Sequence, residues 1–182
     1  MFDHKRAMIS IPRPLPSEYP ASFGTYMKHV PGGDILDILA QQGEEIIALM
    51  ETIGDIGAQH RYAENKWSIK EMLGHLIDTE RLFVYRAMSF ARGDDTVLPG
   101  MSEDAWEAVA DHDGLDLDDL LDEYWLVRAG TIRFFQNLDA ASLARRGRAD
   151  GTTFGVGCTA WLIAGHGRHH RQVLEERYLT GL

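Results

Sequence analysis

Four long stretches of the chain place apolar side chains every three or four positions, which is the period of an α-helix with one buried face. They cover residues 35–56, 69–92, 117–138 and 158–179. No stretch combines strict apolar and polar alternation with β-branched residues, so the pattern predicts no strand. Four long helices joined by connections of different length predict an all-α fold, a four-helix bundle.

Capping signals mark where these helices begin and end. Asp34 precedes the first stretch, where its carboxylate can accept hydrogen bonds from the free amide groups of the first turn. Ser68 and Glu71 form the sequence signature of a capping box at the start of the second. Gly93 is expected to end that helix, and Asp116 to cap the third.

The first 33 residues form a different kind of segment, because they hold five of the six prolines. Proline lacks an amide donor and resists both helix and inner strand. Residues 1–33 are therefore predicted to form an extended, proline-rich N-terminal arm with a short helical turn over 23–29. Residues 34–182 are expected to form one bundle domain. The arm is expected either to pack across that domain or to contact a second subunit.

Composition narrows the classes of function. The net charge of −10 argues against nucleic acid as a partner, because phosphate backbones bind clustered Lys and Arg. Much of the acidity lies in residues 102–125, which we interpret as solvated surface. No apolar run is long enough to span a membrane, and the N-terminus does not read as a signal peptide. With one cysteine, no intrachain disulfide is expected, and a cytoplasmic location is favoured.

Three of the eight histidines fall within five positions near the C-terminus, in the stretch "GHGRHHRQ". His166 and His170 are four residues apart, so on a helix they share a face and lie about 6 Å apart along its axis. His169 is three residues from His166, on the other flank of the same face. Spacing alone does not choose between His169 and His170. Apolar residues three to four positions before His166, and seven to eight after it, turn that face toward the core.

His75 in the second helical stretch has the same character. Met72, Leu82 and Phe83 place it on the inner face of that helix, and Asp78 and Thr79 follow one turn later on the same face. Buried imidazoles must be hydrogen-bonded or bound to a metal.

Three inward histidines on two helices suit a divalent transition metal with open coordination positions. Imidazole binds zinc, nickel, iron and copper. The alternative is that each histidine is a hydrogen-bonded core residue, since sequence alone does not bring His75 into contact with the other two. Asp78 is a candidate to orient an imidazole or a bound water.

Other chemically capable residues have simpler interpretations. His112 is expected to be solvated, and Cys158 to be a small core residue rather than a nucleophile. Arg86 and Arg128 could meet an anionic substrate, although salt bridges are the commoner fate of such residues. Gly74 and Gly165 lower stability inside helices, so they are expected to permit close packing or a needed opening.

The paired motifs "WSIKEMLGHLIDTERLFVYR" and "AGHGRHHRQVLEERY", with "LPG" and an acidic Trp-containing segment between them, resemble the DinB-like superfamily, the DinB/YfiT group of metalloenzymes. The resemblance runs from about Asp34 to Tyr178. It implies a bundle in up-down-down-up order. It also implies a metal bound by three histidines, which match His75, His166 and His170 here, so that His170 is favoured over His169.

The resemblance implies zinc or nickel as the metal and a homodimer as the assembly. Some members are similar to thiol transferases or isomerases that use bacillithiol or mycothiol, and others are described as metal-dependent hydrolases. We therefore expect a metal-dependent enzyme acting on a small molecule, with a thiol-dependent S-transferase or isomerase as the first hypothesis. The alternatives are a metal-dependent hydrolase and a non-enzymatic metal-binding or stress-associated bundle protein.

Overall fold

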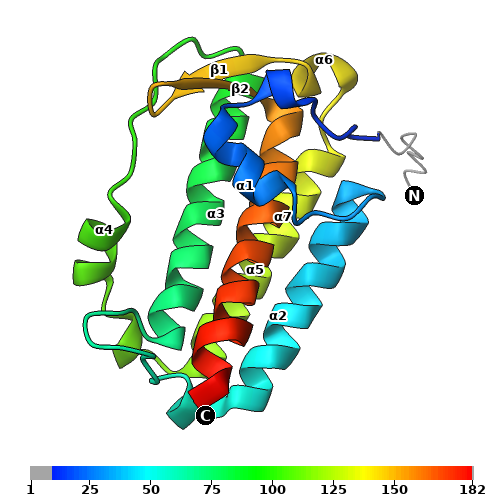
Figure 1. The fold of residues 1–182 in the computed structure, drawn as a ribbon. Coiled ribbons are helices and arrows are strands. Elements are labelled where there is room, and N and C mark those ends of the chain that lie inside the picture. The colour runs from blue at the N-terminus through cyan, green and yellow to red at the C-terminus, as the bar shows by residue number, and fades with distance from the viewer. Residues whose placement is uncertain (1–9, 182) are drawn as a thin grey trace, which may run out of the picture.

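The computed structural model describes residues 10–181, and its body is a bundle of four long helices (Figure 1). These are α2 (Ile35–Gly57), α3 (Ile69–Ala91), α5 (Leu117–Gln136) and α7 (Val156–Val173). Each lies where the apolar period predicts a helix, with ends shifted by a few residues. The four-helix bundle is therefore confirmed. None of the helices in the described part of the chain is long and apolar enough to cross a membrane.

The order and direction of the helices follow from one long connection. Helix α2 packs against α5 and α7, and α3 packs against the same two helices. Helices α3 and α5 run parallel because residues 92–116 lead the chain back along the outside of the bundle (Figure 1). That connection holds α4 (Glu103–Ala110) and a short 3₁₀ turn (His112–Gly114). The result is the up-down-down-up arrangement implied by the family resemblance.

The helix ends use most of the expected caps. The Asp34 carboxylate accepts a hydrogen bond from the amide of Leu36 at 2.8 Å, and Ser68 and Glu71 form the capping box of α3. Gly93 follows α3 with a φ of 78°, which favours glycine. Asp116 precedes α5 but makes no side-chain cap; the carboxylate of Asp55 accepts from the amide of Leu117 instead, at 3.1 Å.

The described part of the arm packs across α7. Two 3₁₀ turns (Pro16–Glu18 and Ala21–Phe23) lead into α1 (Gly24–Met27), the short helix predicted over 23–29. Helix α1 lies against α7, and the indole of Trp161 donates a hydrogen bond to the carbonyl of Ile11 at 3.2 Å. Residues 1–9 of the predicted arm lie outside the described residues.

The prediction that no strand forms is wrong for one short hairpin. β1 (Arg146–Ala149) and β2 (Thr152–Gly155) pair antiparallel after α6 (Ala140–Leu143). Strands of four residues are too short to show a period, and the signal is instead the turn. Asp150 and Gly151 both have positive φ, at 51° and 68°, as an Asp-Gly hairpin turn requires.

A polar layer crosses the bundle at mid-height. We use this name for Gln42, Glu80, Arg128 and His166, one buried residue from each long helix. On every helix these residues separate the apolar positions of one core cluster from those of the other. Arg128 donates to both carboxylate oxygens of Glu80 at 2.8 to 3.2 Å and to the side-chain oxygen of Gln42 at 3.2 Å. Arg128 thus forms a buried ion pair.

Candidate metal centre

The structure brings His75, His166 and His170 together inside the bundle. The Nε2 atom of His166 lies 3.1 Å from Nε2 of His75 and 3.0 Å from Nε2 of His170. His75 and His166 are 4% and 5% exposed, and His170 is partly buried. The residues that the two sequence motifs single out therefore form one cluster with a common centre.

Two glycines next to these histidines permit close packing, as expected. A Cβ atom at Gly165 would lie 2.7 Å from the carbonyl oxygen of Tyr26, so glycine lets α1 rest directly on α7. A Cβ atom at Gly74 would lie 2.2 Å from the ring of His112, so glycine makes room for the connection after α4. The arm and the connection can thus approach α7 and α3 this closely because these side chains are absent.

Burial keeps the three imidazoles neutral. It lowers the pKa of His75 to about 4, and burial together with the charges of His75 and His169 lowers the pKa of His170 to about 3. The pKa of His166 falls well below its usual range, again mainly through burial. Neutral imidazole is the form that binds a metal.

The donor set fits a divalent transition ion. Three Nε2 atoms around a tetrahedral zinc at about 2.05 Å would stand about 3.3 Å apart, which is close to the spacing seen between His166 and its two neighbours. Three protein ligands leave at least one coordination position for water or substrate.

The hydroxyl of Thr79 orients one imidazole of the cluster. Its oxygen lies 3.3 Å from Nδ1 of His75. If Nε2 of His75 carries the free lone pair that a metal needs, Nδ1 carries the proton and donates it to Thr79. Asp78, the residue suggested for this task by sequence, lies beside Arg81 at 3.8 Å, and its carboxylate is about a third exposed. The polar contact to Nδ1 of His75 thus comes from Thr79, four residues later on the helix, rather than from Asp78.

His169 lies beside the cluster without joining it. Its ring packs edge-on against Tyr26 and His170, with ring centres 5.4 and 5.1 Å apart, and it is half-buried. His170, and not His169, converges with His75 and His166, and its role as a ligand stays a prediction.

Two cavities border the cluster, one at His166 and one at His170. One, of about 180 Å³, is lined by His166 and by residues of α3, the arm, the connection and the hairpin. The other, of about 260 Å³, is lined by His170 and by Tyr62, Trp67 and Tyr178. Small molecules can therefore approach the centre without displacing a helix.

Sequence reasoning misses Tyr26 and Glu103, which line the cavity beside His166. Partial burial and the charge of Glu103 raise the pKa of Tyr26, and partial burial and the charge of Asp104 raise the pKa of Glu103. Neither residue lies on a periodic helix face, so no spacing signal could place them.

The expectation that His112 is solvated is wrong. His112 is 9% exposed, and its Nδ1 atom lies 2.8 Å from the carboxylate of Glu107, which is also buried. The hydrogen bond to Glu107 raises the pKa of His112. The acidic segment is thus attached to α3 through the His112 ring that covers Gly74, and it is not surface throughout.

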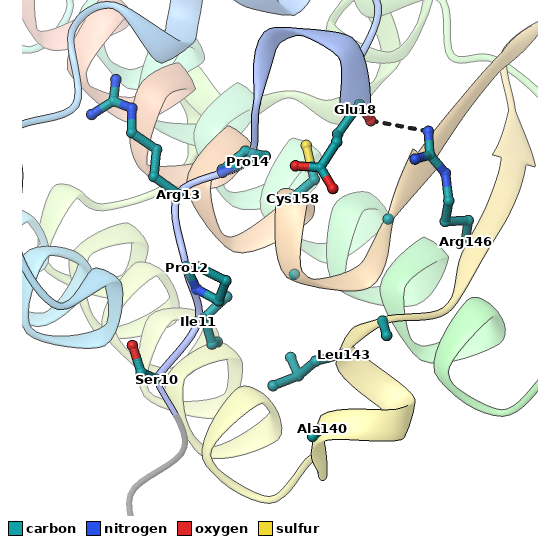
Figure 2. A pocket seen from close by; sticks show the side chains of 13 residues that line it. Ser10, Ile11, Pro12, Arg13, Pro14, Glu18, Ala140, Leu143, Arg146 and Cys158 are labelled. Carbon is teal, nitrogen blue, oxygen red and sulfur yellow. Dashed lines mark hydrogen bonds between the residues drawn. The ribbon is translucent and has the colours of Figure 1, made fainter.

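A separate cavity of about 390 Å³ lies at the start of α7, between the arm and α6 (Figure 2). Cys158 lies in its wall with Glu18 and Arg146. Burial raises the pKa of the Cys158 thiol to about 12, and no histidine within residues 10–181 lines the cavity. Cys158 is therefore a buried residue, as expected, and its raised pKa disfavours the thiolate that a nucleophile needs.

Comparisons with known proteins agree with this geometry. Residues 38–174 match the family model of the DinB superfamily, a range that includes all three histidines of the cluster. A protein of Halalkalibacterium halodurans, "Putative metal-dependent hydrolase BH0277", is 27% identical over 130 residues, which cover 68% of this chain and 72% of that protein.

The fold is also similar to a solved structure. YfiT from Bacillus subtilis, described as "a probable metal-dependent hydrolase with an unusual four-helix bundle topology", superposes with a TM-score of 0.64 at 13% identity, covering 93% of each chain. At this identity the similarity speaks for the fold alone.

Proposed function

Since the chain belongs to the DinB superfamily, we propose that it is a metal-dependent hydrolase of a small-molecule substrate, with one divalent ion held by His75, His166 and His170. The observation that carries the proposal is the convergence of three neutral, buried imidazoles on one point that two cavities reach. The name of the Halalkalibacterium relative supports hydrolysis as the reaction.

Zinc or nickel is proposed as the ion, because imidazole ligands suit both. Such an ion, when bound, supplies a Lewis acid and makes a coordinated water acidic enough to deprotonate near neutral pH. Thr79 holds the His75 ring in the orientation that points Nε2 at the centre. The rings of Trp67 and Phe83 pack against His75 and His166 and limit the access of bulk water.

Two side chains in the cavity beside His166 can handle protons and developing charge. Tyr26 is protonated at neutral pH, as tyrosine ordinarily is, and burial raises its pKa further. Its hydroxyl can therefore donate a hydrogen bond to a substrate oxygen as that oxygen gains charge. Glu103 can accept a proton from the attacking water and return it to the leaving group, and a raised carboxyl pKa favours this role.

Thiol-dependent transfer, the first hypothesis from sequence, stays a prediction, since neither relative's name mentions a thiol. The homodimer also stays a prediction. The two cavities that border the cluster disfavour a non-enzymatic metal site, because structural sites are closed by a fourth protein ligand.

Metal analysis of untagged protein tests the centre. We expect one equivalent of ion in the wild type and in His169→Ala, the matched control, and a large loss in His75→Ala and His170→Ala. Equal metal content in all four proteins would refute the site. The metal-loaded protein is then assayed on a panel of small esters and amides, with and without added bacillithiol or mycothiol. Turnover without thiol that disappears in His75→Ala supports hydrolysis, whereas turnover only with thiol contradicts it.

A further inference from the structure

Arg86 on α3 is a buried cation with incomplete hydrogen bonding. It is 5% exposed, and its Nη2 atom donates to the carbonyl oxygen of Pro99 at 2.8 Å. Its Nε atom is buried and has no hydrogen-bond partner, and Arg86 makes no ion pair among residues 10–181. Arg128, on the neighbouring helix, shows the contrast, since its guanidinium is fully occupied by Glu80, Leu39 and Gln42. A buried guanidinium without an anion is costly, and the cost is removed when a ligand supplies one.

The cavity that Arg86 lines is the one that reaches His166. Thr79 and Phe83 line it between these two residues, along one face of α3. Arg86 lies seven positions after Thr79, which corresponds to about 10 Å along the helix axis. The cavity thus has a cationic end and an end at the candidate metal centre, separated by the length of a small organic molecule.

The other charged side chains in this cavity do not neutralise Arg86. Asp150 lines the cavity and its charge favours the protonated form of Arg86, but it forms no ion pair with it. Glu103 also lines the cavity, and it makes no ion pair with Arg86 within residues 10–181. Among the described residues that line the cavity, Arg86 is the one cationic side chain, since His166 is neutral.

We propose that this cavity is the substrate site and that Arg86 binds a carboxylate group of the substrate while the substrate's opposite end meets the ion beside His166. The substrate class is thus a small acid whose reacting bond lies several bonds away from its carboxylate. A planar guanidinium with a free Nε offers the paired donors that a carboxylate accepts. This inference rests on the proposed function, because the ion defines the reacting end.

Binding of a matched pair of probes tests the inference. The metal-loaded protein is titrated calorimetrically with ω-mercaptohexanoate and with ω-mercaptohexanol, which share a metal-binding thiol and differ in the carboxylate. The acid is expected to bind at least about tenfold more tightly than the alcohol, because a charge-assisted pair is added in a buried site. Equal affinities in the wild type would overturn the proposal without reference to any variant.

Substitution locates the preference. Arg86→Gln is expected to remove the advantage of the acid over the alcohol, and Arg86→Lys to retain only part of it, since lysine cannot offer paired donors. Arg133→Gln, an exposed arginine on α5 outside the cavity, is the matched control and should behave as the wild type. Should Arg86→Gln not fold, Arg86→Lys decides. If Arg86→Lys prefers the acid over the alcohol as strongly as the wild type does, another residue binds the carboxylate and the role of Arg86 is contradicted.

A second measurement separates this proposal from the metal site. Hexanoate and hexanol, which carry no thiol, are compared by thermal unfolding of metal-free protein. If hexanoate alone raises Tm, and only with Arg86 present, the anion site stands even where metal analysis refutes the ion. If metal is bound but hexanoate has no effect in metal-free or metal-loaded protein, the anion site is refuted and the centre stands.

Discussion

The side-chain amide of Gln42 on α2 donates a hydrogen bond to the backbone carbonyl oxygen of Ala164 on α7, at 2.8 Å across the bundle. Ala164 lies two residues before His166, and the same Gln42 accepts from Arg128. A single buried amide therefore connects the ion pair of the polar layer to the turn of α7 that carries the first histidine of the cluster.

Gln42→Met is expected to destabilise the protein by about 1–3 kcal/mol, because it leaves one buried donor of Arg128 with fewer acceptors and removes the contact to α7. Metal affinity should fall as well, since the contact positions His166. Urea denaturation of metal-free protein and competition with a chelator measure the two effects. Gln41→Met, at an exposed position of the same helix, is the control; equal stability of both variants would show that the amide has no role.

Arg128→Met is expected to cost about 3–5 kcal/mol, because it leaves the carboxylate of Glu80 buried without its partner. Adding Glu80→Leu should recover much of this loss, since the uncompensated charge is then gone. Both variants are compared by chemical denaturation with Arg133→Met, which should stay within about 0.5 kcal/mol of the wild type. A double variant less stable than Arg128→Met would contradict the explanation.

Two glycine substitutions are expected to have opposite signs. Gly165→Ala pushes a methyl group against the Tyr26 carbonyl and should destabilise by about 1–3 kcal/mol and make the arm easier to cleave by protease. Gly130→Ala, in α5 with no heavy atom within 4 Å of the new methyl group, should stabilise by up to about 1 kcal/mol through helix propensity. Limited proteolysis and thermal unfolding measure both, and an unchanged arm in Gly165→Ala would count against the close contact.

The stability of the metal-free protein should fall with acidification below about pH 6.5. The pKa of His75 is about 4 in the fold and about 6.5 in the unfolded chain, so the unfolded chain takes up the proton first. The resulting loss in the free energy of unfolding is absent above pH 6.5 and grows as the pH falls. It is complete near pH 4, where it reaches about 3 kcal/mol for this group alone. Denaturation between pH 8 and 4 measures the slope. His75→Gln should show a shallower slope, and an unchanged slope would show that other groups cause it.

Much of the bundle, and the inward direction of His75 and His166, can be predicted because both follow from helical period. Spacing leaves the choice between His169 and His170 open, and the family resemblance favours His170. The spacing of His166 and His170, and the apolar neighbours of His75, fix which way these rings point once the helices form. The helical period of a sequence does not show how far one helix is shifted along its axis relative to its neighbour. For that reason the contact between His75 and His166 becomes visible only in the structure.

The walls of the cavity could not be predicted, for a related reason. Tyr26 and Glu103 come from segments without period, and their positions depend on contacts with α3 and α7. The prediction that His112 is exposed is wrong because an acidic segment indicates exposure only on average, whereas the burial of His112 depends on the absent side chain of Gly74. Thr79 and Asp78 differ by one position on a helix face, which is too fine a distinction for spacing to make.

The long connection between α3 and α5, like the arm and the hairpin, has a consequence for the evolution of the cavity beside His166. The candidate ligands sit on rigid helices, whereas the arm, the connection and the hairpin supply Tyr26, Glu103 and Asp150 to the cavity beside them. Under the proposed function, the residues that hold the ion and those that select the substrate thus lie in parts of the chain that can be altered separately. We therefore expect exchange of these three segments between relatives to change substrate preference while the three histidines stay in place.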